Sequence, residues 1–287
     1  MISIIIPLYN KEQSIEKTIS SVLCQTFGHF ELIIVDDGST DQSITVVKKI
    51  DDKRIRLVEK VNGGVSSARN RGVLESSYEW IAFLDADDLW HKDFLRNIVN
   101  VINSVKNVYV ITTNFSNVTR DGSILSKFET SNEGFFDFFD ITNKQGWHIT
   151  NMSTLCVSKG ELLKTGLFSL NKTHGEDIEV VEKLARMHKF WVIDKVLSYY
   201  VQDAENRAML KSPNIYKTRV YNIESHLIES VEEETYFKKA ILLSIYNYTF
   251  NLNFKSFYIL LKKHLGFVTL SEIFNFFTTK LFKKIRG

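Results

Sequence analysis

The sequence predicts an α/β protein with a central, mostly parallel sheet flanked by helices. Between the N-terminus and residue 105, short apolar runs that end at turn residues alternate with amphipathic stretches. That alternation is typical of βαβ units and of a parallel sheet. Two acidic groups, 36–37 and 85–88, directly follow two of the apolar runs. We therefore expect these acids at the carboxyl ends of strands, where open α/β sheets bind ligands.

Periodicity and turn residues define the elements of the first part of the chain. Apolar runs bounded by turn residues indicate strands, whereas apolar residues every three or four positions, as in Ile15, Ile19 and Val22, indicate a helix. Asp41 is suited to cap one helix, and Gly63-Gly64 form a turn into another. In order, we expect strands at 3–7, 32–35, 54–59 and 80–84, and helices at 14–25, 41–50, 65–75 and 92–103.

The rest of the chain is less regular. Helix 176–188 is the clearest element, because Ile178, Val181 and Leu184 share one side. From residue 216 the pattern is helical, with a break near Gly266. We place a domain boundary near 211–214, which gives a domain of residues 1–211 and a helical C-terminal region of residues 212–287. The other expected elements are strands at 109–118, 154–157 and 191–201, a turn at 121–122, an aromatic loop at 132–147 and a helix at 159–165.

Composition indicates an ordinary globular protein with a sizeable core. The chain is 44% hydrophobic and 24% charged. Cys24 and Cys156 form neither a metal-binding spacing nor a disulfide framework, and we expect both to be buried thiols. The N-terminus lacks the features of a signal peptide, and no apolar run is long enough to span a membrane. These observations predict a cytoplasmic protein.

Charge is distributed unevenly around the small net value of +2. Residues 238–287 contain nine Lys or Arg and one acid, so this part carries 9 − 1 = +8, and the rest carries +2 − 8 = −6. The final segment FTTKLFKKIRG mixes apolar and basic residues. It suits a helix lying on an anionic membrane surface, although a solvated helical appendage explains the same pattern.

Five motifs occur in a specific order. They are I-P-L-Y-N at 6–10, V-D-D-G-S-T-D at 35–41, S-S-A-R-N-R-G at 66–72, F-L-D-A-D-D at 83–88 and H-G-E-D-I-E at 174–179. The series resembles glycosyltransferase family 2, the inverting GT-A enzymes that use nucleotide-activated sugars. The resemblance covers residues 2–201 and implies a GT-A type, Rossmann-like sheet, with the helical C-terminal region as an appendage.

For the nucleotide, the resemblance implies that Pro7, Tyr9 and Asp37 line the base pocket. Asp37 would accept a hydrogen bond from the base, commonly uracil, while Asp36 and Arg69 would support that pocket or the phosphates. Residue chemistry alone leaves alternatives open. Asp36 and Asp37 also suit a turn, and Arg69 suits either a phosphate near a helix N-terminus or a surface ion pair.

For the sugar and the metal, the resemblance implies that Asp85 faces the ribose and that Asp87 or Asp88 holds the ion. Carboxylates suit hard cations, so the expected ion is Mg²⁺ or Mn²⁺. Asp177, next to Glu176, matches the catalytic base position. Taken alone, the acids at 85–88 also suit a solvated turn. Asp177 and Glu176 also have a structural alternative, because the helix dipole favours acids at a helix N-terminus.

The chain departs from the family pattern after the strand that ends near Tyr200. Many relatives carry Y-R-x-H there, but Val201 stands at the Arg position and Asp203 at the His position, with Arg207 nearby. Asp203 is therefore a further candidate metal ligand in place of His. This loop often closes over the diphosphate or the metal in the family.

The aromatic segment at 132–147 allows two interpretations. Its rings and the adjacent His148 would suit stacking on an acceptor sugar, or a helix packed on the core. His174 would border the acceptor or serve a structural role. The segment's aromatic residues are Phe135, Phe136, Phe138, Phe139 and Trp147.

The predicted function is metal-dependent transfer of a sugar from a nucleotide-sugar, UDP by family habit, to an acceptor hydroxyl. The acceptor would be a saccharide or a lipid-linked saccharide in polysaccharide or glycolipid synthesis. Asp177 would deprotonate the attacking hydroxyl, and a single displacement would invert the anomeric centre. The alternatives are a non-catalytic nucleotide-sugar scaffold and, less favoured, a nucleotidyltransferase. No nucleic-acid-reading motif is present.

Overall fold

A computed structural model describes residues 1–130, 132–146, 150–206 and 214–286, with backbone only for 281–286. The predicted domain boundary at 211–212 lies outside these residues, as do Trp147, His148 and Arg207. The described helices are α1 (Ile15–Leu23), α2 (Ser43–Lys48), α3 (Val65–Glu75), α4 (Phe94–Ser104), α5 (Phe138–Gln145), α6 (Lys159–Lys164), α7 (Glu176–Met187), α8 (Val231–Phe250), α9 (Phe254–His264) and α10 (Leu270–Arg286).

The described strands form a single sheet in the order β3-β2-β1-β4-β9-β6-β10-β5, with β7 added beside β6 and β8 beside β10. They are β1 (Ile2–Leu8), β2 (Phe30–Asp36), β3 (Ile55–Glu59), β4 (Trp80–Phe83), β5 (Leu89–Trp90), β6 (Val110–Val118), β7 (Ile124–Phe128), β8 (Gly134–Phe136), β9 (Cys156–Ser158) and β10 (Phe190–Val201).

The first four strands of that order form the parallel sheet predicted from the alternating pattern. The antiparallel β9 lies between β4 and β6, and β6 and β10 then pair in parallel. The short β5 and β8 were not foreseen, because segments of two or three residues leave no periodic signal. The parallel order places the carboxyl ends of β1, β2 and β4 next to each other.

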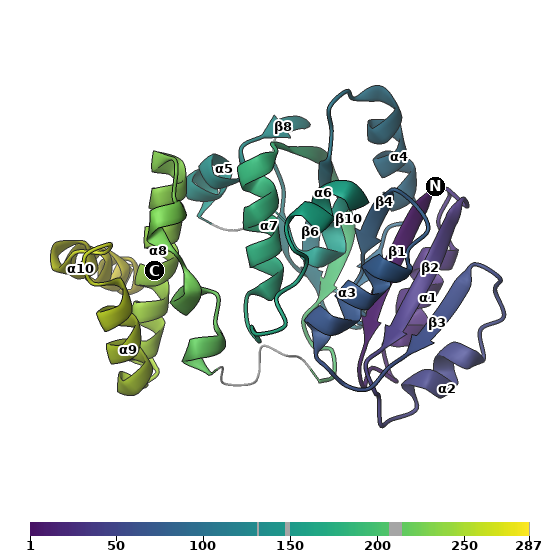
Figure 1. Ribbon diagram of the computed structural model, residues 1–287, viewed down its shortest axis with the longest axis horizontal. Helices are drawn as coiled ribbons and strands as arrows, with labels where there is room; N and C mark the ends of the chain where they lie inside the picture. The colour runs from purple at the N-terminus through teal and green to yellow at the C-terminus, as the bar shows by residue number, and fades with distance from the viewer. Residues whose placement is uncertain (131, 147–149, 207–213, 287) are drawn as a thin grey trace.

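Alternation along β1 divides the core between the two faces of the sheet. Ile4 and Ile6 are buried with residues of α1 and α4, such as Ile19 and Ile98, in one cluster. Ile5 points to the opposite face and belongs to the cluster that includes α3, α7 and α8. Helices therefore cover both faces of the sheet, as predicted (Figure 1).

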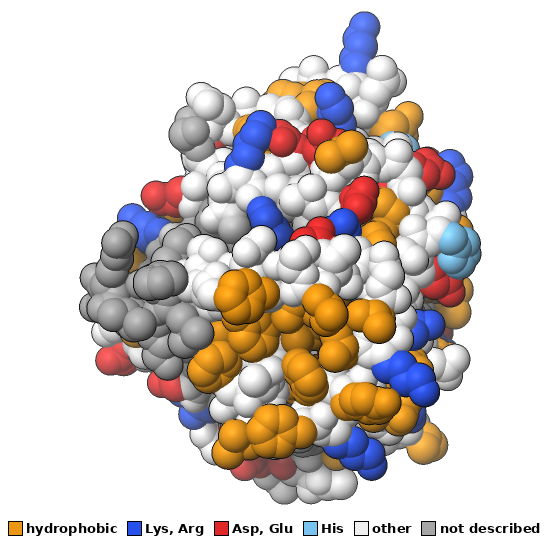
Figure 2. Space-filling view, turned by 90° about the vertical axis from the view of Figure 1, so that its left-hand side faces the viewer, with side chains coloured by type: hydrophobic (Ala, Val, Ile, Leu, Met, Phe, Trp, Pro, Cys, Tyr) orange, Lys and Arg blue, Asp and Glu red, His pale blue; other side chains and the backbone are white. Residues whose placement is uncertain are grey.

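The C-terminal helices form a further layer beyond α7 (Figure 1). Ile241 and Ile245 of α8 and Leu260 of α9 are fully buried in the same cluster as Ile5 of β1. On the outer side of this layer, apolar side chains gather at the surface (Figure 2). The break expected near Gly266 separates α9 from α10, and Gly266 has a φ of 107°.

Candidate active site

The candidate site lies at the carboxyl ends of β1, β2 and β4, next to the N-terminal ends of α3 and α7. Arg69 of α3 joins two of these elements, because it contacts Asp85 after β4 at 2.8 Å and Glu176 of α7 at 3.5 Å. Lys11, after β1, contacts Asp87 at 2.6 Å. Segments that are far apart in the sequence, from the end of β1 to the start of α7, thus meet at one edge of the sheet.

Asp37 joins the end of β2 to the start of α3. Its Oδ1 accepts from the Gly63 amide at 2.9 Å and from Lys60 Nζ at 2.5 Å, and its Oδ2 accepts from the Gly64 amide at 2.7 Å. The side chain is buried. Since each carboxylate oxygen has two lone pairs, Oδ2 keeps one for a further donor. Sequence reasoning missed Lys60, although it follows β3 at the same edge of the sheet.

Asp36 stabilises the turn after β2. Its carboxylate accepts from the amides of Gly38 and Ser39 at 3.0 and 3.1 Å, and the side chain is 1% exposed. This is the turn chemistry that the sequence left open for the residue. Nearby, Pro7 is buried within β1, whereas Tyr9 just beyond the strand is 37% exposed.

Arg69 is the most deeply buried cation of the site, at 3% exposure. Its guanidinium lies 5.4 Å from the centre of the Phe168 ring. Burial lowers its pKa, but the carboxylates of Asp85, Asp177 and Glu176 raise it more, so the pKa lies above its usual range. Nε and NH1 have no hydrogen-bond partner among the described residues. Buried donors usually have a partner, which can be a protein group, water or a bound ion.

The acidic loop after β4 contains two different kinds of carboxylate. Asp85 is partly exposed beside Arg69. Asp87 contacts the Lys11 ammonium, and burial together with the Asp85 charge raises the pKa of Asp87 despite that ammonium. Lys11 also donates to the backbone carbonyl of Glu205. These two aspartates are the members of the loop that reach the site.

Asp88 points away from the other two, into the core. Its Oδ2 accepts from Ser153 Oγ at 2.5 Å and its Oδ1 from the Val201 amide at 3.1 Å, and it is 1% exposed. Burial, followed by the charges of Asp87 and Asp85, raises its pKa well above the usual range. Oδ1 thus fastens the loop after β4 to the end of β10, and Oδ2 fastens it to the turn that contains Ser153. Asp87 is therefore better placed than Asp88 to bind an ion.

The loop after β10 folds back onto the start of α1. Glu205 accepts from Ser14 Oγ at 2.6 Å and also pairs with Arg120. Asp203 is exposed, and its carboxylate accepts from the Arg120 amide at 2.8 Å. Within the described part of the chain, no three His, Cys, Asp or Glu side chains are grouped as a metal site. Glu205, which the sequence did not single out, makes the closer contacts with this region.

Glu176 and Asp177 open α7 after Gly175. Glu176 is buried, and burial together with the Asp177 charge raises its pKa, while Arg69 opposes the shift. Asp177 is partly exposed, and its Oδ1 accepts from the Ile178 amide at 2.8 Å. Of the two acids, Asp177 is therefore the more accessible to an acceptor.

A segment of the C-terminal region is fastened to the residues just before α7. The Arg219 amide donates to the His174 carbonyl at 3.0 Å, and the Thr173 amide donates to the Lys217 carbonyl at 3.0 Å. Gly175 has a φ of 77°, and a Cβ on it would lie 2.8 Å from Arg219 Cβ. Only glycine fits this position without rearrangement. This connection uses the backbone of His174, and the role of its side chain stays a prediction.

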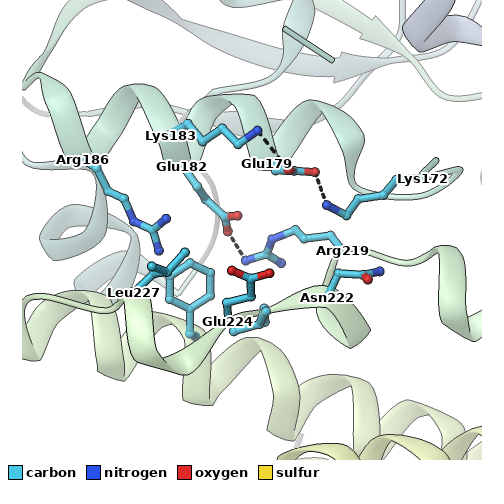
Figure 3. A pocket seen from close by; sticks show the side chains of 11 residues that line it. Lys172, Glu179, Glu182, Lys183, Arg186, Arg219, Asn222, Glu224 and Leu227 are labelled. Carbon is cyan, nitrogen blue, oxygen red and sulfur yellow. Dashed lines mark hydrogen bonds and ion pairs between the residues drawn. The ribbon is translucent and has the colours of Figure 1, made fainter. Parts of the chain in front are cut away.

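The Arg219 side chain lies in a charged cavity of about 170 Å³ between α7 and the C-terminal region (Figure 3). Its guanidinium pairs with Glu182 and lies 5.3 Å from the ring centre of Tyr236. Burial lowers the pKa of Arg219, but Glu182, Tyr236 and Asp177 raise it by more, so the pKa lies above its usual range. Lys172 and Lys183 share Glu179 at 2.6 and 3.1 Å (Figure 3). No motif or periodicity in the sequence indicates this network.

Comparison with known proteins identifies the family. The family model described as glycosyl transferase family 2 matches residues 3–158, more than half of the chain. This chain belongs to glycosyl transferase family 2. An uncharacterized glycosyltransferase of Rickettsia felis is 33% identical over 234 residues, which are 79% of this chain and 37% of that protein. The minor teichoic acid biosynthesis protein GgaB of Bacillus subtilis is 30% identical over 213 residues, 71% of this chain and 23% of that protein.

Solved structures place this family 2 member in the GT-A type fold, as the motif series implied. The crystal structure of S. aureus TarS 1-349 in complex with UDP-GlcNAc matches with a TM-score of 0.67 at 20% identity. The match covers 83% of this chain and 70% of that chain. By contrast, the chain spans less than half of the two sequence relatives.

Two other sequence predictions are corrected. The segment 132–147 is not a loop, because most of it forms β8 and α5. Phe138 and Phe139 are buried in the core, which favours the packing interpretation for these two rings, whereas Phe135 is exposed. Cys156 is buried as expected, but Cys24, just after α1, is exposed.

Proposed function

We propose that this family 2 protein is an inverting glycosyltransferase that moves a sugar from a nucleotide-sugar to an acceptor hydroxyl. One observation carries the proposal: Arg69 contacts both Asp85, on the donor side, and Glu176, beside the proposed base Asp177. A cation between the donor side and the proposed base suits a direct displacement. It neutralises negative charge on the departing diphosphate while the base takes the acceptor proton.

The donor we propose is a UDP-sugar. The fold of TarS, crystallised with UDP-GlcNAc, supports a nucleotide-sugar at this site. The free acceptor capacity of Asp37 and the exposed Tyr9 ring suit a base, which would lie beside Pro7. Asp36 supports this pocket by fixing its turn. Arg69 Nε, which has no partner among the described residues, suits a diphosphate oxygen, because a guanidinium matches phosphate groups well.

Asp177 is the proposed base for the acceptor hydroxyl. It is partly exposed at the N-terminus of α7, so an acceptor hydroxyl can reach it. Glu176 is buried against Arg69, so it orients that cation rather than reaching the acceptor. One carboxylate suffices for a single displacement with inversion, because no covalent intermediate forms.

A divalent ion, Mn²⁺ or Mg²⁺, fits the donor chemistry of this site. Asp87, with Asp85 beside it, would hold the ion, since such ions use one or two carboxylates together with substrate phosphates and water. The ion would supply further neutralisation of the diphosphate. Asp88 would support the loop through Ser153, and Asp203 would remain an outer contact. The Lys11 ammonium, at 2.6 Å from Asp87, marks that carboxylate as a place for positive charge.

The acceptor we propose is a saccharide or lipid-linked saccharide of a cell-surface polymer. The relative GgaB, a minor teichoic acid biosynthesis protein, supports that setting. None of the described helices is long and apolar enough to span a bilayer. We propose that the protein is cytoplasmic and that its basic C-terminal tail contacts the inner face of the plasma membrane.

Donor hydrolysis and transfer assays test the proposal. Purified protein is incubated with UDP-, GDP- and dTDP-sugars and Mn²⁺ or Mg²⁺, and released nucleoside diphosphate is measured. We expect UDP release, reduced about 10²- to 10⁴-fold in Asp177→Asn, because a general base is worth that much. UDP binding, measured by calorimetry, should persist. Glu179→Gln is the matched control, since it removes an acid from the same helix turn but one that pairs with Lys172 and Lys183.

The non-catalytic scaffold makes the opposite prediction. UDP-sugar would bind, but no donor would turn over with either ion, and Asp177→Asn would change nothing. A flat response across the panel by folded protein therefore excludes the transferase. Retention of the anomeric configuration in the product would exclude the single displacement.

A further inference from the structure

The C-terminal helices expose an unusual amount of apolar surface on one side of the molecule. Six side chains at the end of α8, on α9 and at the start of α10 are 60–74% exposed. Figure 2 shows apolar side chains gathered on this face, with basic side chains at its border. We call the six the aromatic face: Leu252, Phe254, Tyr258, Leu265, Leu270 and Phe274.

Both α9 and α10 are apolar on two sides. In α9, Leu260 is fully buried in the core, while Phe254 and Tyr258, one turn apart, point to solvent. In α10, Phe277 packs inward against the core cluster, while Phe274 is 68% exposed. The inward side accounts for the folding of these helices. The outward rings are left without a partner in the described structure and indicate a second apolar environment.

The helices that carry the aromatic face also carry exposed lysines. Lys255, Lys262 and Lys280 are exposed on α9 and α10. Residues 238–287 carry 9 − 1 = +8, while the rest of the chain carries −6. An anionic surface would therefore attract this end of the molecule and repel the other, which fixes the orientation of approach.

We propose that the aromatic face is a membrane-docking surface whose rings enter the interface of an anionic bilayer. Exposed aromatics next to lysines suit the boundary between acyl chains and headgroups. A second copy of the chain is a poorer occupant, because it would bring Lys255, Lys262 and Lys280 of the two copies close together, where they would repel each other. A protein partner is also disfavoured, since lysine is depleted in the cores of protein interfaces.

This inference deepens the proposed membrane contact, because it assigns insertion to α8–α10 in addition to charge in the tail. It rests on the proposed function in one respect only, namely that docking would bring the active site to a lipid-linked acceptor. Vesicle binding is measured without donor or acceptor. UDP release in solution, without vesicles, reports on the active site separately, so failure of one proposal is distinguishable from failure of the other.

Flotation with vesicles of phosphatidylcholine, with or without phosphatidylglycerol, tests the surface. We expect binding to the anionic vesicles only, and Phe254→Ser combined with Phe274→Ser should weaken it by on the order of tenfold or more. The control pairs Leu74→Ser with Leu170→Ser, which are exposed on the other part of the molecule and should not affect binding. Neither pair should change UDP release in solution.

Insertion of the rings is separated from purely electrostatic binding by fluorescence. The fluorescence emission of the Phe274→Trp variant should shift to shorter wavelength on anionic vesicles. Lipids brominated on the acyl chains should quench this emission. Leu74→Trp should show neither change. Equal binding by the serine variant and wild type, loss of all binding in high salt without a fluorescence shift, or a dimer that the serine variant dissociates would each overturn the proposal.

Discussion

Asp88 belongs to the acidic loop of the candidate site, but its side chain turns into the core. Its carboxylate connects Ser153 and the Val201 amide, and it lies close to the charges of Asp87 and Asp85. Burial and those charges raise its pKa well above its ordinary value of 3.8. A group whose pKa is higher in the folded state favours folding while it is protonated. This contribution is lost as the pH rises from the unfolded pKa through the folded pKa.

We predict that Asp88→Asn stabilises the protein at pH 8 and flattens the decline of its stability with rising pH. The asparagine accepts from the Val201 amide and donates to Ser153, but it cannot ionise. The measurement is the unfolding temperature in EDTA at a series of pH values. The gain over wild type should shrink toward pH 4, where Asp88 is protonated.

Asp52→Asn is the matched control, because the pKa of Asp52 is lowered in the folded protein whereas that of Asp88 is raised. The Arg54 guanidinium lowers the pKa of Asp52 to about 2. Its contribution to stability is therefore present above the unfolded pKa and is lost as the pH falls through about 2. This variant should lose a little stability at neutral pH. A parallel pH dependence for Asp88→Asn and wild type would contradict the prediction for Asp88.

Sequence reasoning identified the acids of the site but not their partners. Asp37, Asp85, Asp87 and Asp177 follow strand ends or open a helix, so their positions are readable from periodicity. The partners came from elsewhere. Lys11, for example, carries no motif of its own, and its contact with Asp87 exists only because β1 and β4 are neighbours in the sheet.

At the scale of elements, the start of α7 depends on the C-terminal region. Arg219 packs against Gly175, and its guanidinium pairs with Glu182 on α7. The same guanidinium lies over the Tyr236 ring of α8. The position of Asp177 is therefore fixed from outside the part of the chain that carries the five motifs.

We predict that Gly175→Ala lowers both stability and turnover. The new Cβ would meet Arg219 at 2.8 Å while the backbone keeps a φ of 77°, so the helix start must shift. We expect a loss of about 2–4 kcal/mol in unfolding free energy. Turnover should fall on the order of tenfold to a hundredfold, because catalytic groups tolerate little displacement.

Gly166→Ala separates the clash with Arg219 from the cost of placing alanine at a positive φ. Gly166 also has a φ of 77°, but a Cβ there meets no atom within 4 Å. It should lose only about 1–2 kcal/mol and keep its turnover. Equal loss of turnover in the two variants would show that Arg219 does not position α7.

At the scale of the whole molecule, the C-terminal helices belong to the main core. Ile241 and Ile245 of α8 are buried in the same cluster as Phe83 of β4. Phe138 and Phe139 of α5 lie 5.7 and 5.2 Å from the Tyr236 ring of α8. The predicted domain of residues 1–211 would therefore expose a large apolar surface when it is alone.

We predict that a chain of residues 1–211 does not fold to a soluble monomer. Each large apolar side chain that loses its cover costs about 1.5–3 kcal/mol, and several such losses exceed the usual stability of 5–15 kcal/mol. Removal of residues 280–287 alone should preserve cooperative unfolding. Circular dichroism and thermal melts check both, and a cooperative melt for residues 1–211 would contradict the prediction.

The alternating α/β order, the strand ends that carry the acids and the family are readable from the amino-acid sequence. Each depends on local periodicity or on short motifs, which can be recognised without knowledge of distant contacts. The three-dimensional fold was needed to show that Asp88 turns into the core, that Lys11 contacts Asp87 and that Arg219 packs against the start of α7. Those contacts join residues 65 or more positions apart, or depend on a close approach at Gly175. Packing, not local pattern, selects them.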